Sequence, residues 1–226
     1  MATNLSVSRE VVVRSTSDFV YNTVRQAILT HEYPAGSRLV EAKTSKELNV
    51  SITPVREAFA RLASQGLLTV FPYKGTYVTM ISKQYFEDAY FLRRHLEVMA
   101  AEKGFPNLTD DDIQYYERLC AVSDEAYDRK DLYESIRCDV LFHEHLFDLS
   151  GSSLLTETWY IIKYRIENIQ SYTKPVMNAR FSVRHKPMME AIRAKDRGAY
   201  VAALMEHLNS NQHVVEFPDE KQLRYD

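Results

Sequence analysis

Cysteine is nearly absent from this 226-residue chain, which contains only Cys120 and Cys138. Two cysteines cannot form the disulfide framework of a small secreted protein, so both are expected to be buried thiols in a reducing compartment. The sequence also lacks any run of about 18 apolar residues, which argues against a membrane span. The polar residues 1–10 lack the apolar core of a signal peptide. These absences predict a cytoplasmic protein with no membrane partner.

The chain also lacks a strong excess of either charge, because it contains 28 Lys and Arg and 31 Asp and Glu. With 45% hydrophobic and 26% charged residues, the composition is that of a globular protein and not of a disordered one. The charge is unevenly distributed, however. Residues 1–80 contain nine basic and six acidic side chains, whereas residues 81–226 contain nineteen and twenty-five. The weakly basic first part is suited to meet phosphates, and the acidic remainder is not.

The most informative local pattern is a turn followed by a helix over residues 49–66. Thr53 is predicted as the N-cap, since its hydroxyl can accept from a backbone N–H, and Pro54 suits the first helical position. Arg56 and Arg61 lie outside the apolar stripe of this helix, so its first turn is polar. Such a helix after a short helix and a turn is typical of a helix-turn-helix that reads the DNA major groove. The stripe has helical spacing: Val55, Ala58, Phe59, Leu62 and Ala63.

The segments on both sides of this helix extend the pattern to a complete small domain over residues 15–80. Helices are predicted over about 18–31 and 41–48, before the turn. After the helix, β-favouring residues with period two flank a turn that contains Lys74 and Gly75, which predicts a β-hairpin. Three helices and a hairpin describe a winged helix-turn-helix, with these two residues at the tip of the wing.

Residues 82–215 are predicted to form an all-α domain, because helical periodicity dominates from Ser82 onward. Six or seven helices with short connections describe a bundle that is large enough for its own core. The fold class is therefore mainly α, with a polar N-terminal tail over residues 1–14 and a C-terminal tail over residues 216–226. The predicted helices of the bundle are 82–103, 109–129, 131–149, 152–172, 178–194 and 196–214.

Four side chains of the helical part form a second candidate site. Asp139 and His143 are four residues apart in one predicted helix, so both project from the same face. His185 and His207 lie at similar depths in the last two predicted helices, which would be antiparallel neighbours. Three imidazoles and one carboxylate suit Zn²⁺, Ni²⁺ or a similar ion. Either pair alone is equally compatible with ordinary solvated helix residues, and the pattern leaves both interpretations open.

Eight short segments in this order and spacing cover nearly the whole chain: 24–29, 34–41, 50–58, 62–68, 92–97, 139–143, 184–192 and 207–208. Together they resemble the GntR superfamily of bacterial transcription regulators, specifically its FadR-like branch with an all-helical FCD effector domain. The resemblance implies a DNA-binding winged helix-turn-helix in the first domain. It also implies that the second domain binds an effector and forms a homodimer.

The resemblance places several residues of the first domain toward DNA. Arg56 is the main candidate for a base or phosphate contact, and a surface ion pair is the alternative for it. The residue between Ser51 and Thr53 is commonly Arg in this family but is Ile52 here. An Ile side chain cannot bond to guanine but can contact a thymine methyl group, so we expect a different operator preference. The complete set expected toward DNA is Arg38, Ser51, Ile52, Thr53, Arg56, Lys74 and Gly75.

The resemblance also turns the second candidate site into an expected metal centre. It implies a divalent ion, Zn²⁺ or Ni²⁺, on four ligands: Asp139, His143, His185 and His207. It further implies that Arg93 binds the carboxylate of a small effector, a task that suits the guanidinium fork. An ion pair between Arg93 and Glu97 at the surface is the alternative. One departure from the family is Ser152, because an Asn often follows the preceding Ser-Gly pair.

The function expected from both sites is that of a repressor and not of an enzyme. A homodimer would place two recognition helices on a palindromic double-stranded operator, and a small carboxylate bound at the metal would change its affinity. Two alternatives remain. One is a regulator whose metal is purely structural and that has no small-molecule effector. The other is a metal-dependent hydrolytic enzyme that activates water, but no spare general base is evident beside the ligands.

Overall fold

The computed structural model describes residues 15–173, 179–210 and 215–225. The predicted N-terminal tail, residues 1–14, lies outside them. The chain divides into two compact units, Met1–Met80 with Arg224–Asp226 and Ile81–Leu223, which are described separately below. Within the described residues, no helix combines the length and the apolar character that crossing a membrane requires.

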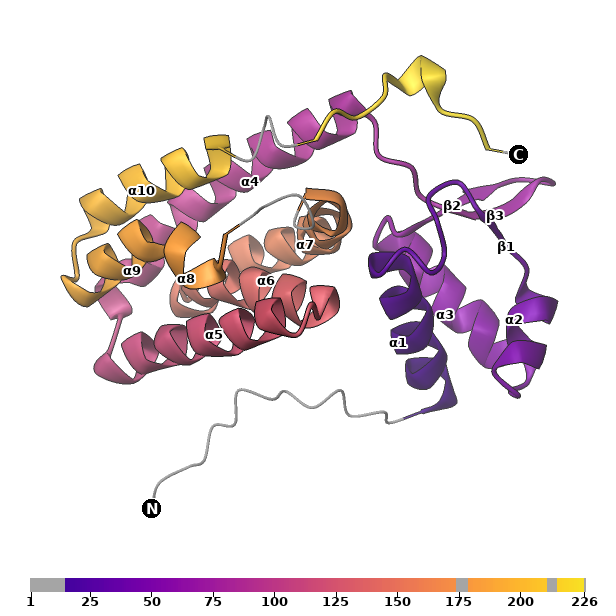
Figure 1. Cartoon of the computed structure of the whole chain (residues 1–226), viewed down its shortest axis with the longest axis horizontal. Coiled ribbons are helices and arrows are strands. Elements are labelled where there is room, and N and C mark those ends of the chain that lie inside the picture. Colours follow the sequence, from indigo (N-terminus) through magenta and orange to yellow (C-terminus); the bar gives the residue numbers. More distant parts are fainter. Residues whose placement is uncertain (1–14, 174–178, 211–214, 226) are drawn as a thin grey trace. The chain divides into compact units, whose positions relative to one another are not determined.

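The first unit is a winged helix-turn-helix, as predicted (Figure 1). Helices α1 and α2 both pack against α3, and the buried residues Val24, Ile28 and Leu62 belong to the core of this unit. A three-stranded antiparallel sheet with the order β1-β3-β2 forms the wing, so a short third strand joins the predicted hairpin. The elements are α1 (Thr16–Leu29), β1 (Arg38–Leu39), α2 (Glu41–Glu47), α3 (Ile52–Ser64), β2 (Leu68–Phe71) and β3 (Gly75–Val78).

Helix α3 begins two residues earlier than the sequence predicts. Its N-cap is Ser51, with φ −71° and ψ 163°, so the prediction of Thr53 as the N-cap is wrong. The reason is that Pro54 fits any position of the first turn, because none of the N–H groups there has a helical partner. Pro54 therefore marks the start of a helix without fixing its first residue. Gly66, at φ +77°, follows the last turn and ends the helix as predicted.

The wing depends on a glycine at the turn between β2 and β3. Gly75 has φ +121°, and a Cβ added there would lie 2.8 Å from Nε of Arg38. A larger residue would therefore be strained and would also push the Arg38 side chain aside. At the other side of the wing, the ring of Tyr225 packs on Phe71 with centroids 4.8 Å apart. The end of the predicted C-terminal tail is thus part of the first unit.

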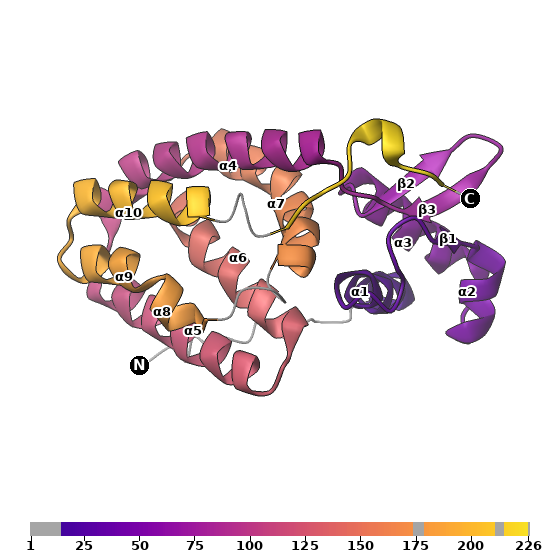
Figure 2. The ribbon, with the colours of Figure 1, turned by 45° about the horizontal axis from the view of Figure 1, so that its top comes forward.

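The second unit is a helical bundle, which confirms the predicted fold class. Helix α6 packs against α4, α5 and α7, and α10 runs alongside α4 in both views (Figures 1 and 2). Thr109 and Asp112 form a capping box at the start of α5. The helices are α4 (Lys83–Gly104), α5 (Asp110–Asp128), α6 (Leu132–Leu149), α7 (Ser153–Thr173), α8 (Phe181–Arg184), α9 (Lys186–Arg193) and α10 (Arg197–Ser210), with short 3₁₀ turns at Phe105–Asn107 and Glu220–Gln222.

One predicted helix of the bundle is broken. Residues 178–194 were expected to form a single helix, but residue 178 lies outside the described residues and the rest divides into α8 and α9 at His185. Pro187 explains the break, because it has no N–H to donate and its ring would clash with the carbonyl four residues earlier. His185 has φ −98° and ψ 2° at this junction. The break between the two helices therefore fixes the position from which the His185 side chain projects.

The core of the bundle contains stacked aromatic residues. The rings of Trp159 and Phe147 stack with centroids 4.6 Å apart, and both are fully buried. The indole Nε1 of Trp159 donates to the buried Glu144 at 2.9 Å, so its polar atom is satisfied. Cys120 and Cys138 are both buried, as expected.

Candidate functional site

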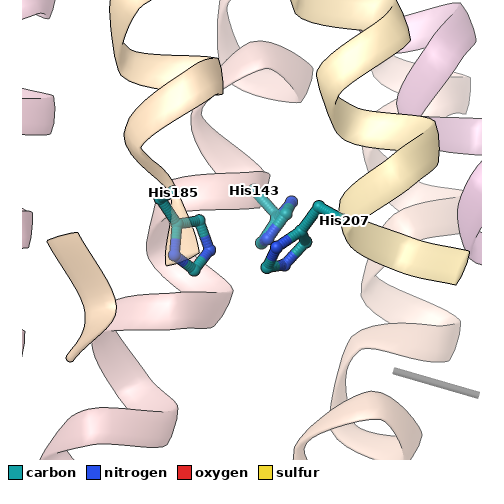
Figure 3. Close-up of side chains that lie close together, drawn as sticks. All are labelled: His143, His185 and His207. Carbon is teal, nitrogen blue, oxygen red and sulfur yellow. The ribbon is translucent and has the colours of Figure 1, made fainter. Parts of the chain in front are cut away.

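Three buried imidazoles meet inside the helical unit (Figure 3). His143 comes from α6, His185 from the junction of α8 and α9, and His207 from the last turn of α10. Each offers a ring nitrogen, and these ligand atoms all lie within 4.8 Å of one another. The ring centroids of His185 and His207 are 4.4 Å apart. The structure therefore brings together three side chains that are up to 64 residues apart in the sequence.

Asp139, the fourth residue of the predicted set, lies beside two of the three imidazoles. Its Oδ1 lies 3.6 Å from Nε2 of His143, and its Oδ2 lies 3.8 Å from Nε2 of His185. Metal–ligand bonds of about 2.0–2.2 Å place neighbouring donor atoms roughly 3–4 Å apart. The distances from Asp139 to His143 and His185 are therefore close to those between neighbouring ligands of one ion.

Two nitrogens of this cluster are buried without a hydrogen-bond partner among the described residues: Nε2 of His143 and Nε2 of His185. Leaving a buried polar atom unsatisfied costs about 1–3 kcal/mol, so native proteins rarely do so. Both atoms face the carboxylate of Asp139 at distances too long for a hydrogen bond. A cation with a preference for imidazole nitrogen and carboxylate oxygen would satisfy all of them.

Burial also sets the protonation state of the imidazoles. Burial lowers the pKa of His185 well below its ordinary value, and the neighbouring His207 lowers it further. For His207, burial and the neighbouring His143 lower the pKa to about 3. Both rings are therefore neutral at pH 7, which is the form in which imidazole binds a metal.

Glu97 is a residue of this site that the sequence did not single out as one. Its Oε2 accepts from Nδ1 of His143 at 2.6 Å, which directs Nε2 of that ring toward the cluster. Its Oε1 accepts from Nε of Arg93 at 2.6 Å. Burial raises the pKa of Glu97, but its electrostatic interactions and hydrogen bonds with His143 and Arg93 outweigh burial and lower the pKa to about 2. The carboxylate is thus ionised and engaged on both oxygens.

Arg93 does pair with Glu97, but the pair is not the surface contact that was the alternative for it. Both side chains are buried, with 1% and 2% of their surface exposed. The Nη1 and Nη2 groups of Arg93 have no hydrogen-bond partner among the described residues. Nη2 lies 3.7 Å from Oδ1 of Asp139. The Nη end of the guanidinium therefore faces Asp139, beside the imidazole cluster.

Two further residues contact Asp139 and were missed by the sequence analysis. Nε2 of Gln170 donates to Oδ1 of Asp139 at 2.6 Å. Nη2 of Arg184 lies 3.5 Å from Oδ2 of Asp139. Arg184 had a local signal, because it directly precedes His185, whereas Gln170 is 31 residues from its partner and had none.

The residues predicted to face DNA lie on the exposed side of the first unit. Ser51, Ile52 and Thr53 are exposed at the start of α3, and Lys74 is exposed at the turn of the wing. The side chain of Arg56 is 63% exposed, and its Nε donates to Oε2 of Glu41 at 2.7 Å. The ion pair that was the alternative for Arg56 is therefore present. Arg38 and Gly75 lie together where β1 meets β3.

Comparison with known proteins links these two units to one family. The profile of "Bacterial regulatory proteins, gntR family" matches residues 16–78, and the profile of the FCD domain matches residues 88–210. The HTH-type transcriptional repressor RspR of Escherichia coli K12 is 27% identical over 194 residues, which are 84% of each chain. An HTH-type transcriptional regulator in the unstable DNA locus of Streptomyces ambofaciens is 30% identical over 84% of this chain and 81% of its own.

Solved structures agree with this relationship. The structure of McbR/YncC from E. coli has a TM-score of 0.73 and 25% identity, and the match covers 87% of this chain and 95% of that one. A GntR-type regulator from Rhodococcus sp. RHA1 has a TM-score of 0.74 at 22% identity, with the same coverage, and shows the shared fold. The FCD match alone covers more than half of the 226 residues. The chain is therefore a DNA-binding transcription regulator of the GntR family that carries an FCD domain.

Proposed function

We propose that this regulator is a homodimeric repressor whose operator affinity changes when a small carboxylate effector binds at a divalent metal ion in the helical unit. The observation that carries the proposal is the cluster of three buried imidazoles with two unpartnered Nε2 atoms around Asp139. These donors fit Zn²⁺ or Ni²⁺. Glu97 supports the proposal because it holds the ring of His143 in the orientation that ligation needs.

The metal ligands in this proposal are Asp139, His143, His185 and His207. The ion would supply a Lewis-acidic centre for one carboxylate oxygen of the effector, and the Nη groups of Arg93, which have no hydrogen-bond partner among the described residues, would bind the carboxylate as well. Glu97 accepts from both Arg93 and His143, so it is not available as a general base. This arrangement favours ligand binding over the hydrolytic alternative. A purely structural metal would leave the Nη groups of Arg93 without a hydrogen-bond partner.

The experiment that tests the proposal is a selection of bound sequences from random double-stranded DNA. It is repeated with the metal removed and with small carboxylic acids added to the metal-loaded protein. We expect a palindromic consensus whose binding falls when one of the acids is present. A consensus that is unaffected by every acid, while the metal stays bound, would support the version with a structural metal only.

At the DNA, we propose that Arg56 is the main base or phosphate contact and that Thr53 and the wing share in reading the bases. Arg38, Ser51 and Lys74 would contact phosphates, and Gly75 would let the wing approach the groove. Ile52 is 36% exposed at the first position of α3, where it can pack on a thymine methyl group.

This position gives a prediction about operator sequence. We expect Ile52→Arg to move the preference at one base position of each half-site from thymine to guanine, because Arg can bond both O6 and N7 of guanine. Repeating the DNA selection with this variant measures the change, and Ile52→Leu is the control that should keep thymine. An unchanged consensus for Ile52→Arg would place residue 52 away from the bases.

We propose that the dimer forms through the exposed apolar faces of α4 and α7. Leu92 and Met99 are seven residues apart on α4, and Leu154 and Ile161 are seven apart on α7, so each pair shares a helix face. All four are exposed, and Leu154 is 73% exposed. The two helices pack against each other, and exposed apolar side chains of this kind are what protein interfaces use.

The dimer surface leads to a second prediction. We expect Ile161→Asp to weaken dimerisation by roughly two orders of magnitude or more, because an unpaired carboxylate would be buried in the interface. Sedimentation velocity over a concentration series measures the dissociation constant. Val183→Asp is the matched control, since Val183 is 62% exposed on α8. Equal association of both variants and the wild type would exclude this surface.

A further inference from the structure

The C-terminal end of the chain belongs to both units in turn. Residues 215–225 follow the helical bundle in the sequence (yellow in Figure 1). The chain passes from one unit to the other twice, once at residues 80–81 and once at residues 223–224. The segment from Phe217 to Tyr225, which we call the C-terminal strap, therefore forms a second covalent link between the two units.

The strap begins on the helical unit, where Phe217 is its anchor. The ring of Phe217 stacks on that of Phe86 in α4 with centroids 5.2 Å apart, and its centroid lies 6.1 Å from that of Tyr172 in α7. The carbonyl of the next residue, Pro218, accepts from the backbone N–H of Lys83 at 2.9 Å. Ring packing and a main-chain bond thus hold the strap at the first turn of α4.

The strap ends on the wing of the first unit, where Tyr225 is its anchor. The rings of Phe71, Tyr77 and Tyr225 form one cluster, with centroids 4.8 Å, 5.5 Å and 5.7 Å apart. The hydroxyl of Tyr225 also accepts from the backbone N–H of Met80 at 3.2 Å. The hydroxyl of Tyr77 donates to the carbonyl of Lys74 at 3.3 Å. Tyr225 therefore packs on the two rings that flank the turn of the wing.

A second link restricts the motion of two joined units. Two domains joined by one linker move relative to each other by default, unless a large apolar interface joins them. A second link closes a loop, so only the rotations that both links allow remain. Here the loop is short, because only residues 81–82 of one link and 219–224 of the other lie between the two hydrogen bonds. A DNA-binding unit with less freedom has less of it to lose on the operator.

We propose that Phe217 and Tyr225 are positioning residues for operator binding. Each anchors one end of the strap, and together they limit how freely the DNA-binding unit turns and hold the rings beside the turn of its wing. This role needs neither a metal nor an effector, so it is independent of the proposed function. It rests on the DNA binding of the family to which the first unit belongs.

The test measures the operator affinity of full-length variants by fluorescence anisotropy at fixed salt, with no acid added. We expect Phe217→Ala and Tyr225→Ala each to weaken operator binding about tenfold, which corresponds to about 1.4 kcal/mol. Phe217→Ala is the sharper of the two, because both ring partners of Phe217 belong to the helical unit. Tyr225→Phe keeps the ring and should keep most of the affinity. Tyr127→Ala is the matched control, since it removes a side chain of α5 that is 38% exposed.

A double variant shows whether the two residues act through one link. Because both substitutions release the same strap, Phe217→Ala with Tyr225→Ala should bind the operator about as well as the weaker single variant. We also expect ¹⁵N relaxation to give both units one rotational correlation time in the wild type and two different ones in each Ala variant. Losses that add in the double variant, or correlation times that do not change, would overturn the proposal.

A variant that keeps both rings covers the case in which an Ala variant unfolds. A flexible Gly-Ser stretch inserted between Asp219 and Glu220 leaves both anchors in the chain but makes the second link slack. It should weaken operator binding in the same way, with no change in melting temperature. Wild-type operator affinity in this variant or in Phe217→Ala would overturn the proposal, and Tyr225 would then support the wing only locally.

Discussion

Replacing His143 and His207 together with Ala is expected to reduce the zinc content of the purified protein from about one ion per chain to near zero. Zinc sites use three or four protein ligands, and this change leaves only Asp139 and His185. The loss of a group that orients a ligand costs about 10–100-fold in metal affinity. Glu97→Gln should therefore lower the zinc affinity by that factor, which is a smaller loss than in the double variant. Elemental analysis after dialysis against buffered zinc measures both effects.

The control for this experiment lies on the same helix. His145 is also on α6, but its Nε2 is bonded to Oδ1 of Asp112 at 2.7 Å and it is not part of the imidazole cluster. His145→Ala should therefore keep the full zinc content. The double variant should also bind operator DNA within a few-fold of the wild type in the absence of acids, which shows that it is folded. Unchanged zinc in the double variant would place the metal elsewhere.

The parts of this site that lie close together in the sequence could be predicted from it. Asp139 and His143 are one helical turn apart, so helical spacing alone puts them on one face. The spacing of Arg93 and Glu97 likewise pairs them, and the structure has this ion pair. What spacing could not show is that the pair is buried, because burial depends on which helices cover α4. In the structure, α6, α7 and α10 all pack on α4, and the Arg93–Glu97 pair is buried.

The contacts that join distant segments were beyond the sequence analysis. Gln170 and Arg184 reach Asp139 from α7 and α8, and no local pattern fixes where those helices cross α6. Local signals also have limited precision. Pro54 is compatible with several positions of a first turn, so the start of α3 was placed at the wrong residue. Pro187 breaks a helix whose periodicity continues on both sides of the break.

Replacing Arg56 with Ala is expected to weaken operator binding by about 1–3 kcal/mol, or roughly 5- to 150-fold, if the guanidinium contacts a base. Arg56 is 63% exposed, so its removal leaves no cavity and should not change the melting temperature. Fluorescence anisotropy with labelled operator at fixed salt measures the affinity. Lys43→Ala is the control, because Lys43 is an exposed cation of α2 that pairs with Glu47.

The ion pair between Arg56 and Glu41 does not contradict a role at DNA. An exposed pair contributes only about 0–1 kcal/mol, so Arg56 can leave Glu41 for a phosphate or a guanine at little cost. Glu41→Gln should therefore keep or increase operator affinity, since it removes both a competitor and a negative charge near the phosphates. The salt dependence then identifies the contact. Loss of a phosphate contact lowers the affinity equally for all DNA sequences and reduces the salt slope by about one. Loss of a base contact instead relaxes the specificity at one base position. Wild-type affinity in Arg56→Ala would mean that the first turn of α3 does not read the operator.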